Sequence, residues 1–399
     1  MSSDRHLTLL LCGDVMTGRG VDQVLPNSCP PHLHESWVRS ALDYVALAER
    51  ANGPIPRGVA FDYIWGEARE ARARAQPDAT IVNLETGVTI SEDAEPKGIN
   101  YRMHPGNVPV LTTAGIDCCV LANNHVLDWG RAGLLDTLDT LAGAGMRVAG
   151  AGRSRGEASA PALLEVGDSA RVLVFAFGTT DSGIPPGWAA GPATPGVNLI
   201  PDFSKTTVER IAELVRGWKR PGDIAVASVH WGPNWGFHVA EHQRWFAHAL
   251  INRAGIDVVH GHSSYHPKAI EVYRDRPILY GCGEFVNDYE GIRGYEEFRS
   301  DLVLMYFHTV ELGTGRLMQL TMTPLQIRNF RLARPSLSDR TWLHETINRE
   351  CHRFGGRVRP SEEALVLEWA PQPKLQLPAG AGCSRRRRTS VSSTCSKCS

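Results

Sequence analysis

The chain has 399 residues, and its 42 Lys and Arg nearly balance 43 Asp and Glu, for a formal net charge of −1. This balance excludes the strongly basic surface of a general nucleic-acid or anionic-membrane binder, so no nucleic-acid partner is expected. The length leaves room for about two domains or one large α/β domain.

The cysteines and the N-terminus bear on the cellular compartment. Nine scattered cysteines, an odd number, do not indicate a disulfide framework. Four lie within or beside apolar runs and are expected to be small core residues: Cys12, Cys118, Cys119 and Cys282. The sequence shows no secretory signal, and no stretch approaches the roughly 18 apolar residues of a membrane span. These features predict a cytoplasmic protein without a membrane segment.

Short apolar runs alternate along the chain with longer segments of helical periodicity. Continuous apolar runs are typical of strands that are covered on both faces. The predicted strands are residues 7–12, 79–84, 116–122, 171–177, 223–229 and 256–261. The predicted helices are residues 129–145, 204–219, which Ser204 can cap, and 240–254. The alternation indicates βαβ units in a sheet with helices on both faces.

The pattern changes after residue 268, where strand-like segments follow one another directly. Residues 269–285 predict a hairpin with its turn near residues 274–277. Residues 301–312 and 315–327 predict two further strands joined by a glycine-containing turn. These additions predict antiparallel strands in a mixed sheet or a two-sheet sandwich.

Three segments lack such periodicity. Residues 86–107 and 178–203 are rich in glycine, proline and acids and predict long loops, which are often functional. Residues 371–399 are of low complexity and predict a disordered tail that carries four consecutive arginines. We expect residues 1–370 to form a single domain.

Polar side chains follow five of the predicted strands, at the end where ligands bind in open α/β sheets. They are Asp14; Asn83 and Glu85; Asn123, Asn124 and His125; His230; and His260, His262 and His266. Carboxylate, amide and imidazole ligands together suit Zn²⁺, Mn²⁺ or Fe better than Ca²⁺. The pattern therefore predicts a divalent-metal site.

Each of these residues also has an ordinary structural explanation. Asp14 could cap a helix, Asn123 and Asn124 could form a turn, and the histidines could be hydrogen-bonded and half-buried. Such explanations would have to coincide at five equivalent strand ends. Asp128, three residues after His125, is a candidate to orient that imidazole.

Five motifs, in order, resemble the CapA family of capsule-synthesis proteins, the PgsA-like poly-γ-glutamate synthesis proteins. They are GDVM, NLET, ANNHVLDWG, HWG and HGHSSYHPKAIEVY…ILYGCGEFVND, and the resemblance runs from about residue 8 to about residue 325. That family is similar to calcineurin-type metallophosphoesterases. The resemblance implies an α/β (α+β) fold, a metallophosphoesterase-like mixed β-sandwich flanked by helices.

The resemblance also implies roles for particular residues. One or two divalent ions (Mn, Zn or Fe) would be held by Asp14, Glu85, Asn124, His230, His262 and His266. His125 would be the catalytic acid or electrostatic catalyst, with Asp128 beside it. The residues expected to support the site or contact the substrate are Asn83, Asn123, His260 and Lys268.

The sequence departs from the metallophosphoesterase pattern in two motifs. The first motif, normally Asp-x-His, here reads Asp14-Val15-Met16, so one ligand to one metal is missing. The last motif, normally Gly-His-x-His, here spaces its histidines as His262 and His266. A single ion, or a weak second one, is therefore compatible with the sequence.

Two classes of function remain open from the sequence. The chain could be a metal-dependent hydrolase or transferase acting on a γ-glutamyl amide or a phosphoester, with a small-molecule or polyanionic polymer substrate. It could instead be a non-catalytic accessory component of a polyglutamate or capsule synthase, working with biosynthetic partner enzymes. Basic residues near the motifs, such as Lys268, could bind a polyanion or be solvated.

Overall fold

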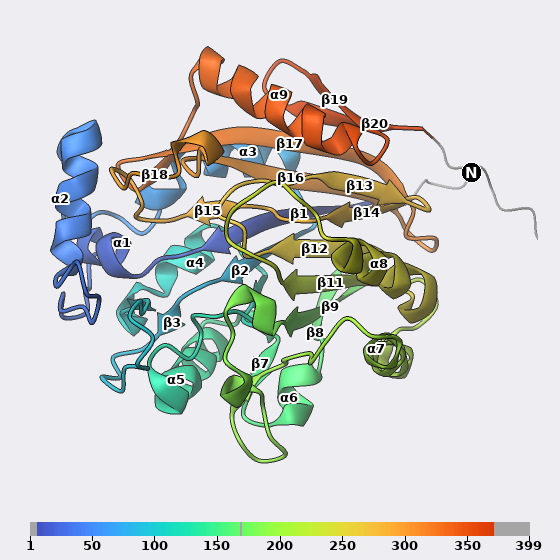
Figure 1. The fold of residues 1–399 in the computed structure, drawn as a ribbon, viewed down its shortest axis with the longest axis horizontal. Helices are drawn as coiled ribbons and strands as arrows, with labels where there is room; N and C mark the ends of the chain where they lie inside the picture. Colours follow the sequence, from blue (N-terminus) through green and yellow to red (C-terminus); the bar gives the residue numbers. More distant parts are fainter. Residues whose placement is uncertain (1–5, 168–169, 371–399) are drawn as a thin grey trace, which may run out of the picture.

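The computed structural model describes residues 6–167 and 170–370. Two mixed β-sheets pack face to face, and most helices cover their outer faces (Figure 1). The predicted α/β fold with a mixed β-sandwich flanked by helices is therefore confirmed. The predicted tail, residues 371–399, lies outside the described residues.

The first sheet has β1 near its middle. On one side β1 pairs in parallel with β2. On the other side, residues 6–11 of β1 pair antiparallel with β16, and Asp14 and Val15 pair in parallel with β15. The strands in spatial order are β19 (Gly356–Pro360), β20 (Leu365–Trp369), β17 (Leu317–Arg328), β16 (Leu302–Glu311), β1 (His6–Val15), β2 (Ala79–Leu84), β5 (Cys118–Val120) and β6 (Arg147–Ala149), with β15 (Glu284–Val286) beside β1 and β18 (Arg331–Ala333) beside β17.

The second sheet has a parallel centre with antiparallel strands at its two edges. Its order is β13 (Ile270–Tyr273), β14 (Arg276–Leu279), β12 (Val258–His262), β11 (Ile224–His230), β9 (Ala170–Gly178) and β8 (Ala162–Val166). Two short ribbons complete the strands: β3 (Gly87–Val88) with β4 (Arg102–Met103), and β7 (Ala151–Gly152) with β10 (Gly196–Val197).

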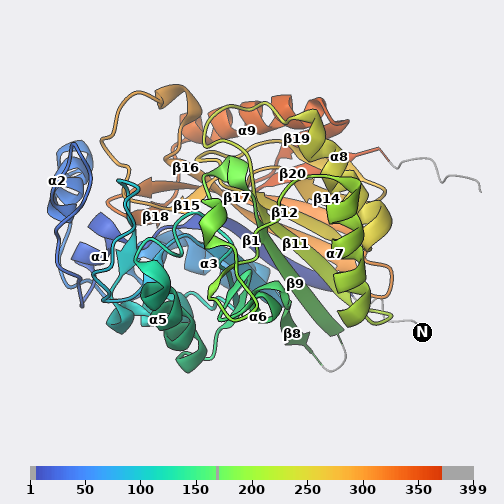
Figure 2. The ribbon, with the colours of Figure 1, turned by 60° about the horizontal axis from the view of Figure 1, so that its bottom comes forward.

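The helices lie mainly on the outer faces of the sandwich (Figure 2). Those packed on the first sheet are α1 (Arg19–Val24), α2 (Ala41–Asn52), α3 (Gly66–Ala75), α4 (Pro109–Thr113) and α5 (Gly130–Gly143). The second sheet carries α7 (Lys205–Trp218) and α8 (Glu241–Ala249), while α6 (Arg155–Ser159) packs by β7 and α9 (Leu337–His352) by β19. Among the described helices, none is both long and apolar enough to cross a membrane.

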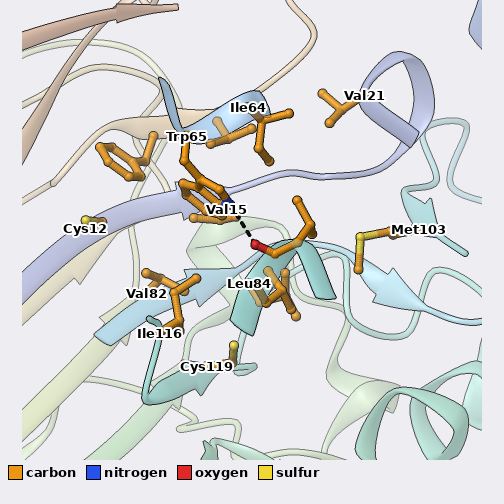
Figure 3. Close-up of a cluster of buried hydrophobic side chains, with 14 of the residues drawn as sticks. Cys12, Val15, Val21, Ile64, Trp65, Val82, Leu84, Met103, Ile116 and Cys119 are labelled. Carbon is orange, nitrogen blue, oxygen red and sulfur yellow. Dashed lines mark hydrogen bonds between the residues drawn. The ribbon is translucent and has the colours of Figure 1, made fainter. Parts of the chain in front are cut away.

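The apolar residues of each central strand divide between two core layers. In β1, Leu9 and Leu11 face the second sheet, whereas Leu10 and Cys12 face the helices. Figure 3 shows the helix-side layer, where the buried Trp65 packs among strand residues and donates an indole hydrogen bond of 2.6 Å to a backbone carbonyl of α4. Burial on both faces explains the continuous apolar runs of these strands.

Most predicted elements are present, with shifted ends. All six predicted strands occur, although the one at 116–122 is reduced to β5. The helices expected at 129–145, 204–219 and 240–254 appear as α5, α7 and α8, and a π-helical turn over Leu250–Ala254 continues α8. Ser204 caps α7 by accepting a hydrogen bond from the Thr207 amide. The four cysteines expected in the core are buried and free.

The predicted hairpin at 269–285 is right in its turn and wrong in its length. Arg274 and Asp275, both with positive φ, join β13 to β14 in an antiparallel pair. The second strand ends at Leu279, however, and residues 284–286 cross to the first sheet as β15. That crossing brings Glu284 to β1, which the hairpin prediction did not anticipate.

Candidate metal centre

The candidate centre is built around Asp14, near the carboxyl end of β1. Asp14 is in register with Asn83 of β2 and with Glu284 of β15. The neighbouring backbone is very close: a Cβ on Gly13 would lie 1.7 Å from the Gly283 carbonyl oxygen, and the Asp14 amide donates to that oxygen at 3.0 Å. Glycine at position 13 therefore permits the approach that places the two carboxylates together.

Asp14, Glu85 and Glu284 form a buried group of carboxylates, each offering an oxygen within 4.8 Å of the others. Both oxygens of Glu284 and Oε2 of Glu85 lack a hydrogen bond of normal geometry within the described part of the chain. Burial raises the pKa of Asp14 to about 7, and burial together with mutual repulsion raises the pKa of the two glutamates well above the usual range. A cation would offset both the burial and the repulsion.

A second group shares Asp14 with His230 and His262. These histidines end β11 and β12 and are in register with each other. Their Nδ1 atoms are 2.8 Å apart, and His262 Nδ1 is 3.6 Å from Asp14 Oδ1. Burial lowers the pKa of both imidazoles well below the usual value, so both are neutral near pH 7.

The hydrogen-bond partners fix which nitrogen of His262 carries its proton. His260 Nε2 lies 2.8 Å from the Cys12 carbonyl, which can only accept, so the His260 proton is on Nε2. Ser228 therefore donates to His260 Nδ1 (3.0 Å) and accepts from His262 Nε2 (2.9 Å). The Nδ1 of His262 is left as a free lone pair that faces Asp14 and His230.

The same reasoning applies to His230. Its Nε2 lies 2.9 Å from Asn124 Oδ1, to which it donates, leaving Nδ1 as a lone pair. Two lone pairs at 2.8 Å beside a carboxylate repel one another unless a cation or a shared proton lies between them. Imidazole nitrogens and a carboxylate are the ligand types that Zn²⁺ and similar ions take. The residues present therefore fit a divalent metal.

His125 and Asp128 form a dyad beside these groups. His125 Nδ1 is 2.6 Å from Asp128 Oδ2, and the other Asp128 oxygen accepts from Lys97 Nζ at 2.7 Å. The His125 ring stacks on Tyr101 with 3.9 Å between centroids. Burial lowers the pKa of His125 to about 4, although Asp128 opposes the shift. The carboxylate can only accept, so His125 Nδ1 donates to it and Nε2 is a free acceptor.

A chain of amides connects the dyad to the carboxylates. Asn83 Nδ2 donates to Asp14 Oδ1 at 2.7 Å, and Asn123 Nδ2 donates to Asn83 Oδ1 at 2.9 Å. Asn123 Oδ1 in turn accepts from the His125 amide at 3.1 Å. These buried amides hold the ends of β1, β2 and β5 in a fixed arrangement.

The predicted ligand Asn124 lies beside the second group, with its Oδ1 2.9 Å from His230 Nε2, while His266 and Lys268 bond to backbone carbonyls. His266 is in neither ligand group of the described residues; its Nδ1 is 3.1 Å from the Pro267 carbonyl, and its ring stacks on Phe298. Lys268 is buried and donates to the His238 carbonyl at 2.8 Å.

Residues 8–289 match the family model "Bacterial capsule synthesis protein PGA_cap". The chain belongs to this family. A relative from Mycobacterium tuberculosis named "Probable polyglutamine synthesis accessory protein" is 49% identical over 371 residues, 92% of this chain and 97% of its own. The CapA proteins of Bacillus subtilis and Bacillus anthracis are 29% and 25% identical, covering 86% and 82% of this chain and 78% and 68% of theirs.

Sequence reasoning did not place three residues in this candidate centre. Glu284 lies in residues 269–285, which the sequence predicted to be a hairpin, so no site role was assigned to it. Its position in the motif GCGEFVND could have identified it. Ser228 lies inside an apolar run, where a single serine carries no functional signal. Lys97 lies in the loop expected over 86–107, and only the fold brings it to Asp128.

Proposed function

We propose that the protein is a divalent-metal-dependent hydrolase or transferase in capsule or polyglutamate-type biosynthesis. Its substrate would be a γ-glutamyl amide or a phosphoester. One observation carries the proposal: the carboxylates of Asp14, Glu85 and Glu284 converge with two histidine lone pairs in a buried site. Burying these groups together without a cation costs free energy of folding. Clusters of buried groups with perturbed pKa values occur mostly at functional sites.

The metal ligands in this proposal are Asp14, Glu85, Glu284, His230 and His262. Asp14 belongs to both groups, and His230 Nε2 lies 3.7 Å from Glu85 Oε1, so the two groups adjoin. This arrangement would accommodate one ion or two neighbouring ions. When bound, Mn, Zn or Fe would lower the pKa of a water molecule and polarise a carbonyl or phosphoryl oxygen.

His125 would move protons during the reaction. Its Nδ1 donates to Asp128, so Nε2 is available to take a proton and deliver it to the leaving oxygen or nitrogen. Tyr101 fixes the ring plane by stacking, and Lys97 holds the second oxygen of Asp128. Asp128 would thereby orient the imidazole and stabilise its protonated form.

The alternative is a non-catalytic accessory component that works with partner enzymes of polymer synthesis and contacts the polymer. The names of two relatives favour it, since one is called an accessory protein and the other a biosynthesis protein. In this alternative the buried carboxylates and histidines would hold a structural ion. We also propose that the protein is cytoplasmic, as predicted from the sequence, and cell fractionation would test this location.

Elemental analysis of protein purified without chelators tests the proposal first. We expect about one or two equivalents of Mn, Zn or Fe, reduced in His262→Ala and Glu284→Gln and retained in His125→Ala. Metal-loaded protein is then assayed with p-nitrophenyl phosphoesters and γ-glutamyl-p-nitroanilide. His125→Ala should lower turnover by about 10²-fold or more, while His352→Ala, an exposed histidine of α9, should not.

The results separate the two functions. No bound metal and no uptake on addition would contradict the metal-dependent mechanism. Metal uptake with no turnover of either substrate class, and no effect of His125→Ala, would favour the accessory role.

A further inference from the structure

A cavity of about 460 Å³ lies at the end of the second sheet that is opposite to the candidate centre. Asp223, directly before β11, and Asp257, directly before β12, both line it. From there the two strands run in parallel to His230 and His262, the residues that end them (Figure 1). β11 has seven residues and so spans about 20 Å. The cavity is therefore separate from the centre.

The lining of this cavity is rich in basic residues, although the formal net charge of the whole chain is only −1. The cationic lining residues are Arg216 of α7, Lys219 and Arg220 directly after α7, and Arg253 of the π-helical turn that follows α8. Asp223 and Asp257 are the acidic residues of the lining. A cavity lined mainly by one sign of charge attracts ligands of the opposite sign.

Both acidic side chains of the lining are already paired with cations. Asp223 accepts two hydrogen bonds from the guanidinium group of Arg171, at 3.0 and 2.5 Å. Asp257 accepts from Lys219 Nζ at 2.6 Å and from Arg276 Nε at 3.2 Å. Because these three cations neutralise the two carboxylates, the acidic residues do not cancel the charges of the remaining arginines in the lining.

Three guanidinium groups in the lining have no partner within residues 6–167 and 170–370. Arg216, Arg220 and Arg253 are exposed, and none of them takes part in an ion pair in this part of the chain. Basic residues near the end of a helix often serve its last carbonyls. Here Lys219 has that role, since its Nζ donates to the Gly255 carbonyl at 2.6 Å. The three arginines are therefore available to a ligand.

We propose that this cavity binds a stretch of an acidic polymer, a γ-linked glutamate chain, through the carboxylates of successive residues. Guanidinium groups bind carboxylates through two parallel hydrogen bonds, and three of them around one cavity suit a chain with repeated carboxylates. The inference rests on the proposed function in polyglutamate-type biosynthesis and adds a site that holds the polymer. A chain held at the far end of β11 would stay near the centre between reactions.

Fluorescence anisotropy with fluorescein-labelled deca-γ-glutamate tests the proposal on the full chain, in EDTA and 50 mM NaCl. We expect saturable binding that weakens when the NaCl concentration is raised, because salt screens exposed charges. The triple variant Arg216→Gln, Arg220→Gln, Arg253→Gln should bind the probe at least about tenfold more weakly. Each single substitution should weaken binding about two- to threefold, which keeps the test available if the triple variant does not fold.

A charge-matched variant is the control for long-range attraction. Arg147, Arg155 and Arg357 are also exposed arginines without an ion pair among the described residues, and they lie outside the cavity. Replacing all three by glutamine changes the net charge as much as the cavity triple variant does, and should leave the affinity within about twofold. Equal losses in the two triple variants, or no binding of the probe by the parent chain, would overturn the inference.

Two further probes identify the kind of acidic chain. A γ-linked chain carries each carboxylate directly on its main chain, whereas an α-linked chain carries it on a flexible side chain that loses more entropy on binding. We therefore expect deca-α-glutamate to bind more weakly than deca-γ-glutamate, and a thymidine decanucleotide to bind more weakly still. Equal or tighter binding of deca-α-glutamate would assign the cavity to an acidic protein segment, and of the decanucleotide to a phosphate backbone. Either result overturns the inference.

Metal content and turnover of the same samples separate this test from that of the proposed function. The cavity triple variant should keep the metal uptake and the turnover of γ-glutamyl-p-nitroanilide of the parent chain. Absence of metal uptake by the parent contradicts the metal mechanism, and polymer binding is still measurable in EDTA. Metal uptake and turnover, with equal polymer binding by the parent and the cavity triple variant, overturn this inference alone.

Discussion

Asp14 and Glu284 are register partners on adjacent parallel strands, although one lies in the first strand of the chain and the other in the fifteenth. Both side chains are buried, and neither oxygen of Glu284 has a normal hydrogen bond among the described residues. This pairing brings carboxyl groups close together near the carboxyl end of β1.

Glu284→Gln should have opposite effects with and without metal. In the metal-free protein the substitution removes one of three crowded carboxylates, so we expect the free energy of unfolding to rise by about 1–3 kcal/mol at pH 7.5. With metal present, loss of a ligand should weaken affinity at least about tenfold. Denaturant unfolding in EDTA and metal titration measure the two effects.

Glu296→Gln, at the exposed end of the same segment, is the control for that substitution. It should change neither quantity. A loss of stability for Glu284→Gln in the metal-free protein would contradict the electrostatic explanation, because the glutamine keeps the size of the side chain while removing its charge.

Gly13→Ala should separate Asp14 from Glu284. The new methyl group would collide with the Gly283 carbonyl oxygen, and both atoms belong to backbone segments that a rotamer change cannot move. We expect a loss of at least about 2 kcal/mol in unfolding free energy and weaker metal binding. Gly143→Ala, where a Cβ meets no atom within 4 Å, should be nearly neutral in both assays.

Ser228→Ala should weaken metal binding without unfolding the protein. Ser228 accepts from His262 Nε2 and thereby keeps the Nδ1 lone pair directed at Asp14. Losing such a supporting hydrogen bond typically costs about 10–100-fold in metal affinity. Ser264→Ala removes a buried hydroxyl that bonds the His266 carbonyl and should leave the affinity unchanged. Equal affinities for the two variants would show that Ser228 does not set the tautomer.

His308 should make the protein sensitive to acid. Its ring is buried between the sheets, its Nε2 has no partner among the described residues, and burial lowers its pKa to about 3. Below pH 6.5 the unfolded chain binds a proton there that the folded chain does not, so stability falls as the pH falls.

His308→Leu isolates this contribution, because other titrating groups affect both proteins alike. Between pH 6.5 and 4.5 the parent chain should lose about 2–3 kcal/mol more unfolding free energy than His308→Leu. Urea unfolding across that range gives the difference. Parallel pH profiles would mean that His308 is protonated in the folded state.

The sequence predicted the elements that local patterns determine. Continuous apolar runs located β1, β2, β9, β11 and β12, because strands buried on both faces need apolar residues throughout. The polar residues that follow these strands drew attention to Asp14, Glu85, His230 and His262, since the carboxyl ends of parallel strands meet at one edge of a sheet.

What the sequence could not predict depends on contacts between distant segments. Glu284 follows a glycine in a strand-like run, and nothing local shows that the run leaves the second sheet to join β1. His266 was expected as a ligand because it is close to His262 in sequence. In the fold its ring lies among aromatic rings, and its buried Nε2 has no hydrogen-bond partner among the described residues, so its role as a ligand stays a prediction. Lys97 and Ser228 gain their roles from the dyad and the histidines they contact, so no motif marks them.

The position of β1 also has a consequence for synthesis on the ribosome. One edge of β1 can pair with β2 soon after the first 84 residues emerge, but its other edge pairs with β15 and β16, which end at Val286 and Glu311. At about 5–20 residues per second, that apolar edge waits on the order of ten seconds or more for its partner. A nascent chain with an unpaired central strand is prone to aggregation, so heterologous production should benefit from chaperone co-expression.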